Sequence, residues 1–198
     1  MNIARRLKAA LALSPPPGLL AGDLAELPDA ELHLAAVLVA ITDRPEPGLH
    51  LTLRREHLRS HAGQVAFPGG RLDPGEDVVT AALREAEEEI GLPPSAVELW
   101  GAADKYRTIT NFLVTPILGL VPPDLVLFPH EHEVADLFEA PLSFVLDPAN
   151  QHRMSVEFQG ATRQYYQINW NGRRIWGATA AMLVNLRLRL EALESSNP

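Results

Sequence analysis

The sequence predicts an α/β fold in which a mixed β-sheet is covered by helices on both faces. A continuous apolar run at 33–42, HLAAVLVAIT, is typical of a central strand buried on both sides. Two amphipathic helical patterns, one between Asp77 and Gly91 and one at 178–193, lie between and after the segments that favour strands. Helices placed in this way can cover both faces of one sheet.

The other elements follow in chain order. Residues 1–30 are expected to form a short amphipathic helix, a break at Pro15-Pro16-Pro17 and a loop that ends near Pro28. Apolar alternation and flanking turn residues predict further strands at 49–54, 96–101, 110–120, 154–158, 165–170 and 173–176. Asn171-Gly172, between the last two, is the dipeptide that a tight hairpin turn prefers.

Two segments near the end of the chain have other patterns. Residues 131–137 are expected to form a short helix or a loop that leads to Pro141. The helix at 178–193 should turn Met182, Leu186, Leu190 and Leu193 inward. With 198 residues, the chain is expected to form one domain, 1–198.

The composition excludes several classes of function. The formal charge is −8 and the isoelectric point is about 5.3, which argues against nucleic-acid and anionic-membrane surfaces. No segment approaches the roughly 20 apolar residues that span a bilayer. The chain has no cysteine, so disulfides, thiolate nucleophiles and cysteine zinc sites are excluded, and a cytoplasmic location is expected. The sequence is compatible with a homodimer but identifies no interface.

The most informative stretch is 70–92, GRLDPGEDVVTAALREAEEEIGL. Asp73-Pro74-Gly75 favours a turn before the helix, and Gly91 followed by Pro93 favours an end after it. On a helical wheel, the apolar stripe of this helix centres near about 110° and its acidic stripe near about 320°, so the two should be roughly opposite. The apolar stripe consists of Val79, Leu83, Ala86 and Ile90.

The acidic stripe is formed by Glu85, Glu88 and Glu89, spaced i, i+3 and i+4. Like charges at this spacing destabilise a bare helix, and a divalent cation bound by the carboxylates would neutralise them. Mg²⁺ and Mn²⁺ are the natural candidates because both favour carboxylate oxygens. The small Ala81 and Ala82 should leave room beside the acids for a ligand. The alternative is a solvated acidic helix face.

The stretch resembles the Nudix box, written G-x5-E-x7-R-E-U-x-E-E-x-G-U with U apolar. The pattern is met by Gly70, Glu76, Arg84, Glu85, Ala86, Glu88, Glu89, Gly91 and Leu92. Ala86 is smaller than the aliphatic residue that is usual there. The resemblance implies a Nudix-type α/β/α sandwich with a mixed sheet and a loop-helix-loop catalytic motif.

A second motif lies just upstream, at 51–70, and resembles the signature of the coenzyme A pyrophosphatase subfamily. The matching residues are Leu51, Thr52, Arg59, Gly63, Phe67, Pro68, Gly69 and Gly70. His50 replaces an expected leucine, and Arg55 an expected serine or alanine. The resemblance implies substrate contacts in this segment, and its basic side chains are of the kind that binds phosphate. The expected contact residues are Arg54, Arg55, Arg59, His61, Phe67, Gly69 and Gly70. Any single arginine here could instead be solvated or pair with Glu56.

The resemblance also suggests roles for the acidic residues. Glu85 and Glu89 are the expected principal metal ligands, and Glu88 is a further ligand or the base that acts on water. Glu76 and Arg84 are expected to orient these glutamates without contacting the metal themselves. Glu133 is a reserve candidate for the base, whereas the neighbouring His130 and His132 are expected to be ordinary surface residues.

The implied reaction is hydrolysis of coenzyme A to 3′,5′-ADP and 4′-phosphopantetheine, with Mg²⁺ or Mn²⁺ as cofactor and a small molecule as the partner. Two alternatives remain open at this point. One is a Nudix pyrophosphatase that acts on ADP-ribose, NADH or a nucleoside triphosphate. The other is a Nudix-fold protein that binds a ligand without catalysis.

Overall fold

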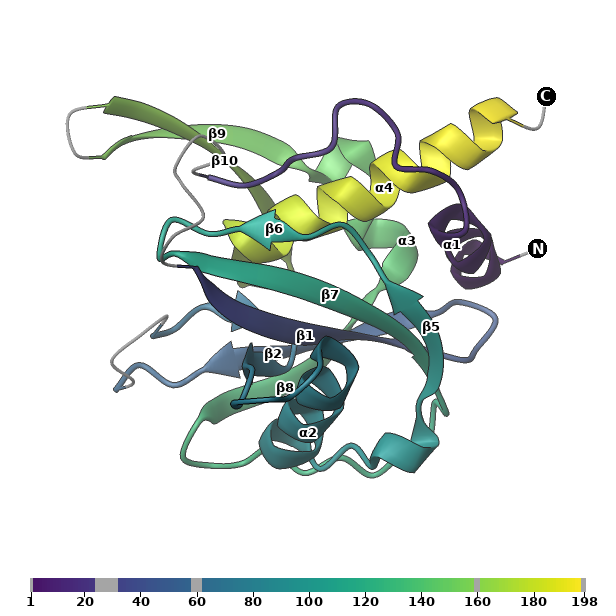
Figure 1. The fold of residues 1–198 in the computed structure, drawn as a ribbon, viewed down its shortest axis with the longest axis vertical. Coiled ribbons are helices and arrows are strands. Elements are labelled where there is room, and N and C mark those ends of the chain that lie inside the picture. The colour runs from purple at the N-terminus through teal and green to yellow at the C-terminus, as the bar shows by residue number, and fades with distance from the viewer. Residues whose placement is uncertain (1, 24–31, 58–61, 159–160, 197–198) are drawn as a thin grey trace.

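The computed structural model describes residues 2–23, 32–57, 62–158 and 161–196, in which an eight-stranded mixed sheet is the central element (Figure 1). Its main path runs β3-β2-β1-β7-β5; β4 pairs with β1, β6 with β7, and β8 with β2. The strands are β1 (His33–Thr42), β2 (Gly48–Arg54), β3 (Val65–Ala66), β4 (Gly69–Arg71), β5 (Glu98–Ala102), β6 (Tyr106–Arg107), β7 (Phe112–Val121) and β8 (Val134–Pro141). β1 is parallel to β7 and antiparallel to β2, so the sheet is mixed as predicted.

Helices cover both faces of this sheet (Figure 1). α2 (Val78–Ile90) lies on one face, and α1 (Ile3–Leu11), α3 (Leu142–Val145) and α4 (Ala178–Ser196) lie on the other. β1 contributes alternate residues to the two hydrophobic clusters: Leu38 packs on the α2 side, whereas Val39 packs on the side of α1 and α4. This alternation explains the continuous apolar run, because every second residue of the strand faces a different core.

A smaller antiparallel sheet follows β8 and α3 in the chain. Two short 3₁₀ helices complete the described elements: η2 (Pro94–Ala96) before β5 and η3 (Pro148–Asn150) before β9. The smaller sheet has the order β11-β10-β9 and consists of β9 (His152–Phe158), β10 (Ala161–Trp170) and β11 (Arg173–Trp176). Asn171 and Gly172 have φ of 45° and 76°, as the predicted hairpin turn requires. β9 and β10 extend beyond the helical layer (Figure 1).

One predicted element is wrong. Residues 134–137 belong to strand β8 rather than to a short helix or loop. β8 pairs antiparallel with β2, from Gly48 opposite Pro141 to Arg54 opposite Val134. The strand forms because β2 needs a partner for its backbone N–H and C=O groups, and local patterning does not reveal such a distant pairing.

The predicted C-terminal helix is confirmed and extends to Ser196 as α4. Met182, Leu186 and Leu190 are buried and Leu193 packs against the same core. Buried polar residues on α4 also hold the N-terminal segment in place: the Asn185 side chain accepts a hydrogen bond from Leu20 N (2.8 Å) and donates one to Leu20 O (2.9 Å). In the ranges that the structure describes, no helix is long and apolar enough to cross a membrane.

His50 on β2 gives the fold a sensitivity to acid. The pKa of His50 is lowered from 6.5, chiefly because burial disfavours the charged imidazole, and Glu139 only partly opposes this. Below about pH 6.5 the unfolded chain therefore binds more protons at this site than the folded chain, and stability falls as the pH falls. We expect His50→Leu to reduce the drop in Tm between pH 7.5 and pH 5.5, measured by circular dichroism. An unchanged drop would contradict this assignment.

Candidate active site

The loop and helix of the predicted catalytic motif are built by local interactions. Asp77 caps α2, because its side chain accepts hydrogen bonds from Val79 N (2.8 Å) and Thr80 N (3.1 Å). Gly91 ends the helix in a left-handed conformation with φ of 66°. Both ends agree with the sequence prediction.

The predicted apolar stripe of α2 packs on the sheet, with Ala86 and Ile90 buried and Val79 and Leu83 against the same cluster, but the buried face is wider than predicted. Ala81, Ala82 and Ala86 are fully buried in the core cluster shared with β1, so Ala81 and Ala82 leave no room for a ligand. Their small side chains allow the helix to approach the sheet closely. Glu89 lies on this same buried side, with 3% of its surface exposed, instead of opposite the packing face.

Glu89 is held beneath the helix by two donors from the sheet. Arg54 Nη1 donates to Glu89 Oε1 (3.0 Å), and Gly69 N donates to Glu89 Oε2 (3.2 Å). Burial raises the pKa of Glu89 to about 7, Arg54 and the Gly69 amide oppose this rise, and Glu85 and Glu133 add to it. The site therefore holds more negative charge than its own donors neutralise.

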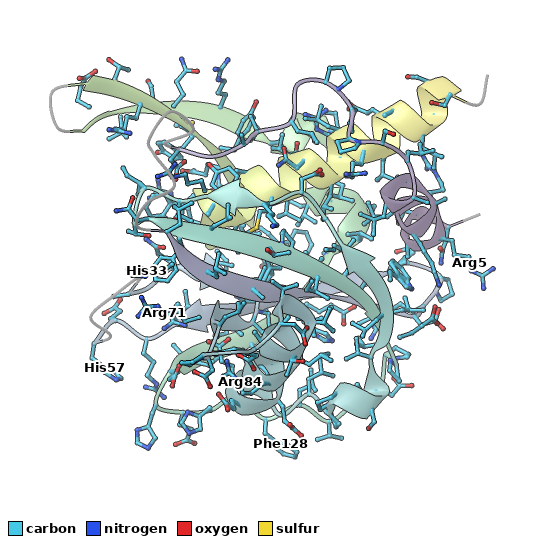
Figure 2. The ribbon with its side chains drawn as sticks, in the orientation of Figure 1. Arg5, His33, His57, Arg71, Arg84 and Phe128 are labelled. Atoms are coloured by element: carbon cyan, nitrogen blue, oxygen red, sulfur yellow. The ribbon has the colours of Figure 1, made fainter. Side chains whose placement is uncertain are left out.

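Arg84 of α2, labelled in Figure 2, ties the loop before this helix to the acidic residues of the helix. Its guanidinium donates two hydrogen bonds to Glu76 (2.9 and 3.0 Å) and further ones to Glu85 (2.9 Å), Glu88 (3.2 Å) and Arg71 O (3.1 Å). Glu76 also accepts from Asp73 N (2.9 Å), which closes the turn before the helix. Because of the Arg84 hydrogen bond, the pKa of Glu76 is lowered. The geometry agrees with the predicted orienting role of Arg84 and Glu76.

The two glycines before the loop are needed for close packing. A Cβ at Gly69 would lie 2.4 Å from Ala36 O, so β4 could not reach β1 with a larger residue there. A Cβ at Gly70 would lie 2.5 Å from the Glu85 carboxyl group. The absence of a side chain at Gly70 thus leaves room for the Glu85 carboxylate.

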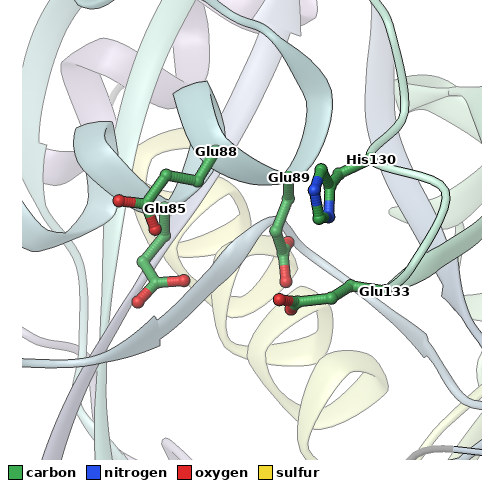
Figure 3. Close-up of a pocket in the computed structure, with 5 residues that line it drawn as sticks. All are labelled: Glu85, Glu88, Glu89, His130 and Glu133. Carbon is green, nitrogen blue, oxygen red and sulfur yellow. The ribbon is translucent and has the colours of Figure 1, made fainter.

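Five side chains line one pocket of about 360 Å³: Glu85, Glu88, Glu89, His130 and Glu133. Glu85 and Glu88 enter from α2, whereas Glu133 reaches toward Glu89 from the segment before β8 (Figure 3). The backbone fixes this segment, because Arg55 N donates to Glu133 O (2.9 Å) and His130 N donates to Glu89 O (2.8 Å). His130 was expected to be an ordinary surface residue, and its place in the pocket follows only from this packing.

The donors in this pocket suit a hard divalent cation. Four of its five lining side chains are carboxylates. Burial is the main cause that raises the pKa of Glu85, as it is for Glu89. The neighbouring charges of Glu88 and Glu133 raise the pKa of Glu85 further. Within the described parts of the chain, no three acidic or imidazole side chains already converge as a cation cage. Glu88 is turned toward Arg84 and Glu89 toward Arg54. The uncompensated charge and oxygen donors fit Mg²⁺ or Mn²⁺, with Glu85, Glu88 and Glu89 as the groups that would hold it.

The residues predicted to bind the substrate differ in where the structure places them. Arg59 and His61 fall outside the described residues. Arg54 pairs with Glu89, and Arg55 is half-buried beside Glu133; the Nε atoms of both arginines are buried without a hydrogen-bond partner among the described residues. Phe67 is 2% exposed and packs in the core, so it supports this segment from inside, and its expected contact with a substrate stays a prediction.

The Gly70–Glu85 contact leads to a prediction for the glycine pair. In Gly70→Ala, the Glu85 carboxylate must move, because its flexible end can give way more easily than backbone. We expect kcat to fall on the order of 100-fold at nearly unchanged Tm. Gly69→Ala meets the backbone of Ala36 instead and should lower Tm. Full activity of Gly70→Ala at saturating Mg²⁺ would show that the Glu85 position is unimportant.

Comparison with known proteins identifies the family. The NUDIX domain model matches residues 32–166, which include the whole pocket and both glycines. The chain belongs to the Nudix family. It is therefore a Nudix hydrolase, an enzyme of a family whose members generally use divalent metal ions.

Curated relatives and solved structures agree with this assignment. A protein of Escherichia coli O7:K1 named uncharacterized Nudix hydrolase NudL is 44% identical over 157 residues, covering 79% of this chain and 82% of that protein. The NudL protein of Shigella boydii serotype 4 has the same identity and coverage. The M. smegmatis Nudix hydrolase RenU shares the fold, with a TM-score of 0.54, 21% identity and coverage of 84% and 88%. The MutT protein of Methanosarcina mazei Go1 also shares the fold, with a TM-score of 0.50 and 16% identity over 84% of this chain and 95% of that one.

Proposed function

We propose that this Nudix hydrolase cleaves the diphosphate of coenzyme A or its acyl derivatives, giving 3′,5′-ADP and 4′-phosphopantetheine or its acyl form. The observation that carries the proposal is the convergence of the α2 carboxylates and Glu133 on one pocket, next to the basic end of β2, where Arg54 pairs with Glu89 and Arg55 N bonds Glu133 O. The subfamily motif at 51–70 supplies the choice of coenzyme A over other diphosphates. Mg²⁺ or Mn²⁺ is the proposed cofactor.

Some carboxylates at the pocket would hold the cation, and other residues orient those carboxylates. A bound divalent cation supplies screening of the diphosphate charge and a lowered pKa of its water. Glu85 and Glu89 would hold the cation, and Arg84 keeps Glu85 and Glu88 in place. Arg54 and the Gly69 amide orient the Glu89 carboxylate, so its charge remains directed at the pocket.

Glu133 and Glu88 are the two candidates for the base. Both line the pocket and both are exposed, so either can exchange protons with solvent. Glu88 already accepts a hydrogen bond from Arg84, whereas no side-chain donor to Glu133 is found among the described residues. This favours Glu133 as the group that takes the proton from the attacking water.

Coenzyme A should be the best substrate in a direct comparison. The purified chain is incubated with coenzyme A, ADP-ribose, NADH and dATP in Mg²⁺ or Mn²⁺, and products are identified by chromatography. We expect 3′,5′-ADP and 4′-phosphopantetheine to form with the highest kcat/KM. A higher value for ADP-ribose, NADH or dATP would replace coenzyme A with that substrate.

The 3′-phosphate should distinguish coenzyme A from dephospho-coenzyme A. If Arg55 and the neighbouring basic residues contact this phosphate, its loss removes charge-assisted hydrogen bonds, which should lower kcat/KM by at least about tenfold. Steady-state rates on the two compounds measure the ratio. Equal kcat/KM values would remove the basic segment from substrate recognition.

A further inference from the structure

Strand β9 is an open edge of the smaller sheet. In the order β11-β10-β9, it pairs with β10 on one side and leaves the backbone groups of its other side without a strand partner in the described chain. β9 and β10 also extend away from the helices (Figure 1). An open edge of this length is a template for pairing with another strand, and proteins usually protect such edges with proline, lysine or a bulge. The sequence HRMSVEF contains neither proline nor lysine, and its register with β10 is regular.

The side chains of β9 are exposed throughout residues 152–157. Met154 and Val156 are 40% and 47% exposed, although both are large and apolar. Met154 lies opposite Tyr165 of β10, whose ring contacts Trp176 edge-on at 5.8 Å. Met154, Val156, Tyr165 and Trp176 lie on the same side of this sheet, and we call them the β9 face. Arg174 covers the two rings, at 5.8 Å from that of Tyr165 and 4.7 Å from that of Trp176, so the apolar part of the face at the open edge is Met154 and Val156.

The sequence of β9 is complementary to itself when read in the opposite direction. An antiparallel pairing of two copies about Ser155 places Arg153 opposite Glu157 of the second copy, and Met154 opposite Val156. A two-fold axis makes each of these contacts twice. A shift of the centre by one residue, to Met154 or Val156, places Arg153 opposite Ser155 or beyond the strand and loses the charge pair.

The backbone geometry permits the same register. Backbone groups in a strand point alternately to its two sides, so residues separated by an even number point the same way. Arg153, Ser155 and Glu157 form one such set, and Met154 and Val156 form the other. Each residue therefore meets a partner from its own set, and the ladder of hydrogen bonds can continue across the axis.

We propose that the open edge of β9 binds β9 of a second copy of this chain, antiparallel about Ser155, to form a continuous six-stranded sheet and a two-fold dimer. Met154 of each copy then lies beside Val156 of the other, and two Arg153–Glu157 pairs flank Ser155. The partner is another copy because the charge pattern matches itself. The paired segment is short and each chain carries a formal charge of −8, so the dimer is weak.

Analytical ultracentrifugation of the full chain tests the pairing, over about 1–500 µM. We expect a reversible monomer–dimer equilibrium in the unmodified protein. Arg153→Glu and Glu157→Arg each place like charges opposite one another twice, which should raise the dimer dissociation constant by about tenfold or more. The double variant R153E/E157R exchanges the charges and should restore it. Arg5→Glu, an exposed change on α1 that alters the net charge as Arg153→Glu does, is the matched control for that variant and should leave dimerisation unchanged.

Three outcomes would overturn the proposal. They are a monomer at every concentration, a dimer that neither single variant weakens, and a double variant that stays as weak as the single ones. All three altered side chains are exposed, so we expect each variant to fold, and circular dichroism checks this. Hydrolase activity does not enter the test, so the proposed substrate can fail while the pairing stands.

Discussion

Glu89→Gln should lower kcat by at least about 100-fold, because loss of even an outer partner of a metal ligand costs about 10–100-fold and Glu89 is proposed to be a ligand itself. The change keeps the shape of the side chain but removes the charge. Glutamine keeps one acceptor oxygen, so it can accept the hydrogen bond from either Arg54 Nη1 or Gly69 N, whereas its NH2 group replaces the other acceptor.

Stability should hardly change in this variant. Burial penalises the charged form of Glu89, as its pKa of about 7 indicates, so neutral glutamine avoids that penalty. Arg54 loses its ionic partner, but its side chain is 23% exposed and can be hydrated. We therefore expect a Tm within a few degrees of the unmodified chain, together with a loss of Mn²⁺ affinity measured by electron paramagnetic resonance.

Glu87→Gln is the matched control. Glu87 belongs to the same run of glutamates but is exposed and does not line the pocket. It should keep both activity and Mn²⁺ affinity. If Glu89→Gln retained the kcat of Glu87→Gln, the cation site on α2 would have to be abandoned.

Arg189→Met should produce the largest loss of stability. Arg189 lies on α4 with 6% of its side chain exposed and forms two hydrogen bonds with Asp104, at 2.5 and 2.8 Å. Its guanidinium also donates to Ala10 O (3.3 Å) and Leu13 O (3.1 Å) at the end of α1. Methionine leaves the buried Asp104 carboxylate and two carbonyl groups without this donor.

Removal of one member of a buried ion pair costs about 3–5 kcal/mol. For a chain of this length, that corresponds to a decrease in Tm of roughly 6–20 °C. Lys8→Met is the control, since Lys8 and Glu98 form a pair whose side chains are 50% and 59% exposed, and its loss should cost less than about 1 kcal/mol. Differential scanning calorimetry compares the two variants. A double variant, Asp104→Leu with Arg189→Met, should recover part of the loss, and equal Tm values for Arg189→Met and Lys8→Met would contradict the assignment.

The sequence predicted the catalytic helix well because its limits depend on neighbouring residues. Asp77 and Gly91 act within one turn of the helix ends, and the spacing of Glu85, Glu88 and Glu89 follows from helix geometry alone. The predicted apolar stripe does face the sheet, since Ala86 and Ile90 are buried and Val79 and Leu83 pack against the same cluster. The helical wheel missed that the buried face also includes Ala81, Ala82 and Glu89, because small alanines permit a close approach to β1.

Contacts between distant segments were harder to predict. The place of His130 in the pocket depends on the hydrogen bond between His130 N and Glu89 O, and the place of Glu133 depends on Arg55 N. β8 was missed because its hydrogen bonds are made with β2. Phe67 matched a motif position, yet its side chain filled a space in the core that no local pattern describes.

By itself, the sequence determined the family, the limits of α2, the central strand at 33–42 and the spacing of the acidic residues that we propose as cation ligands. Spacing within a helix or strand is a local property, so it can be read without the fold. Only the tertiary structure decided that Glu89 is buried, that Glu133 and His130 share its pocket, and that β9 remains an open edge. These features depend on which surfaces meet, and that is settled by the packing of the whole chain.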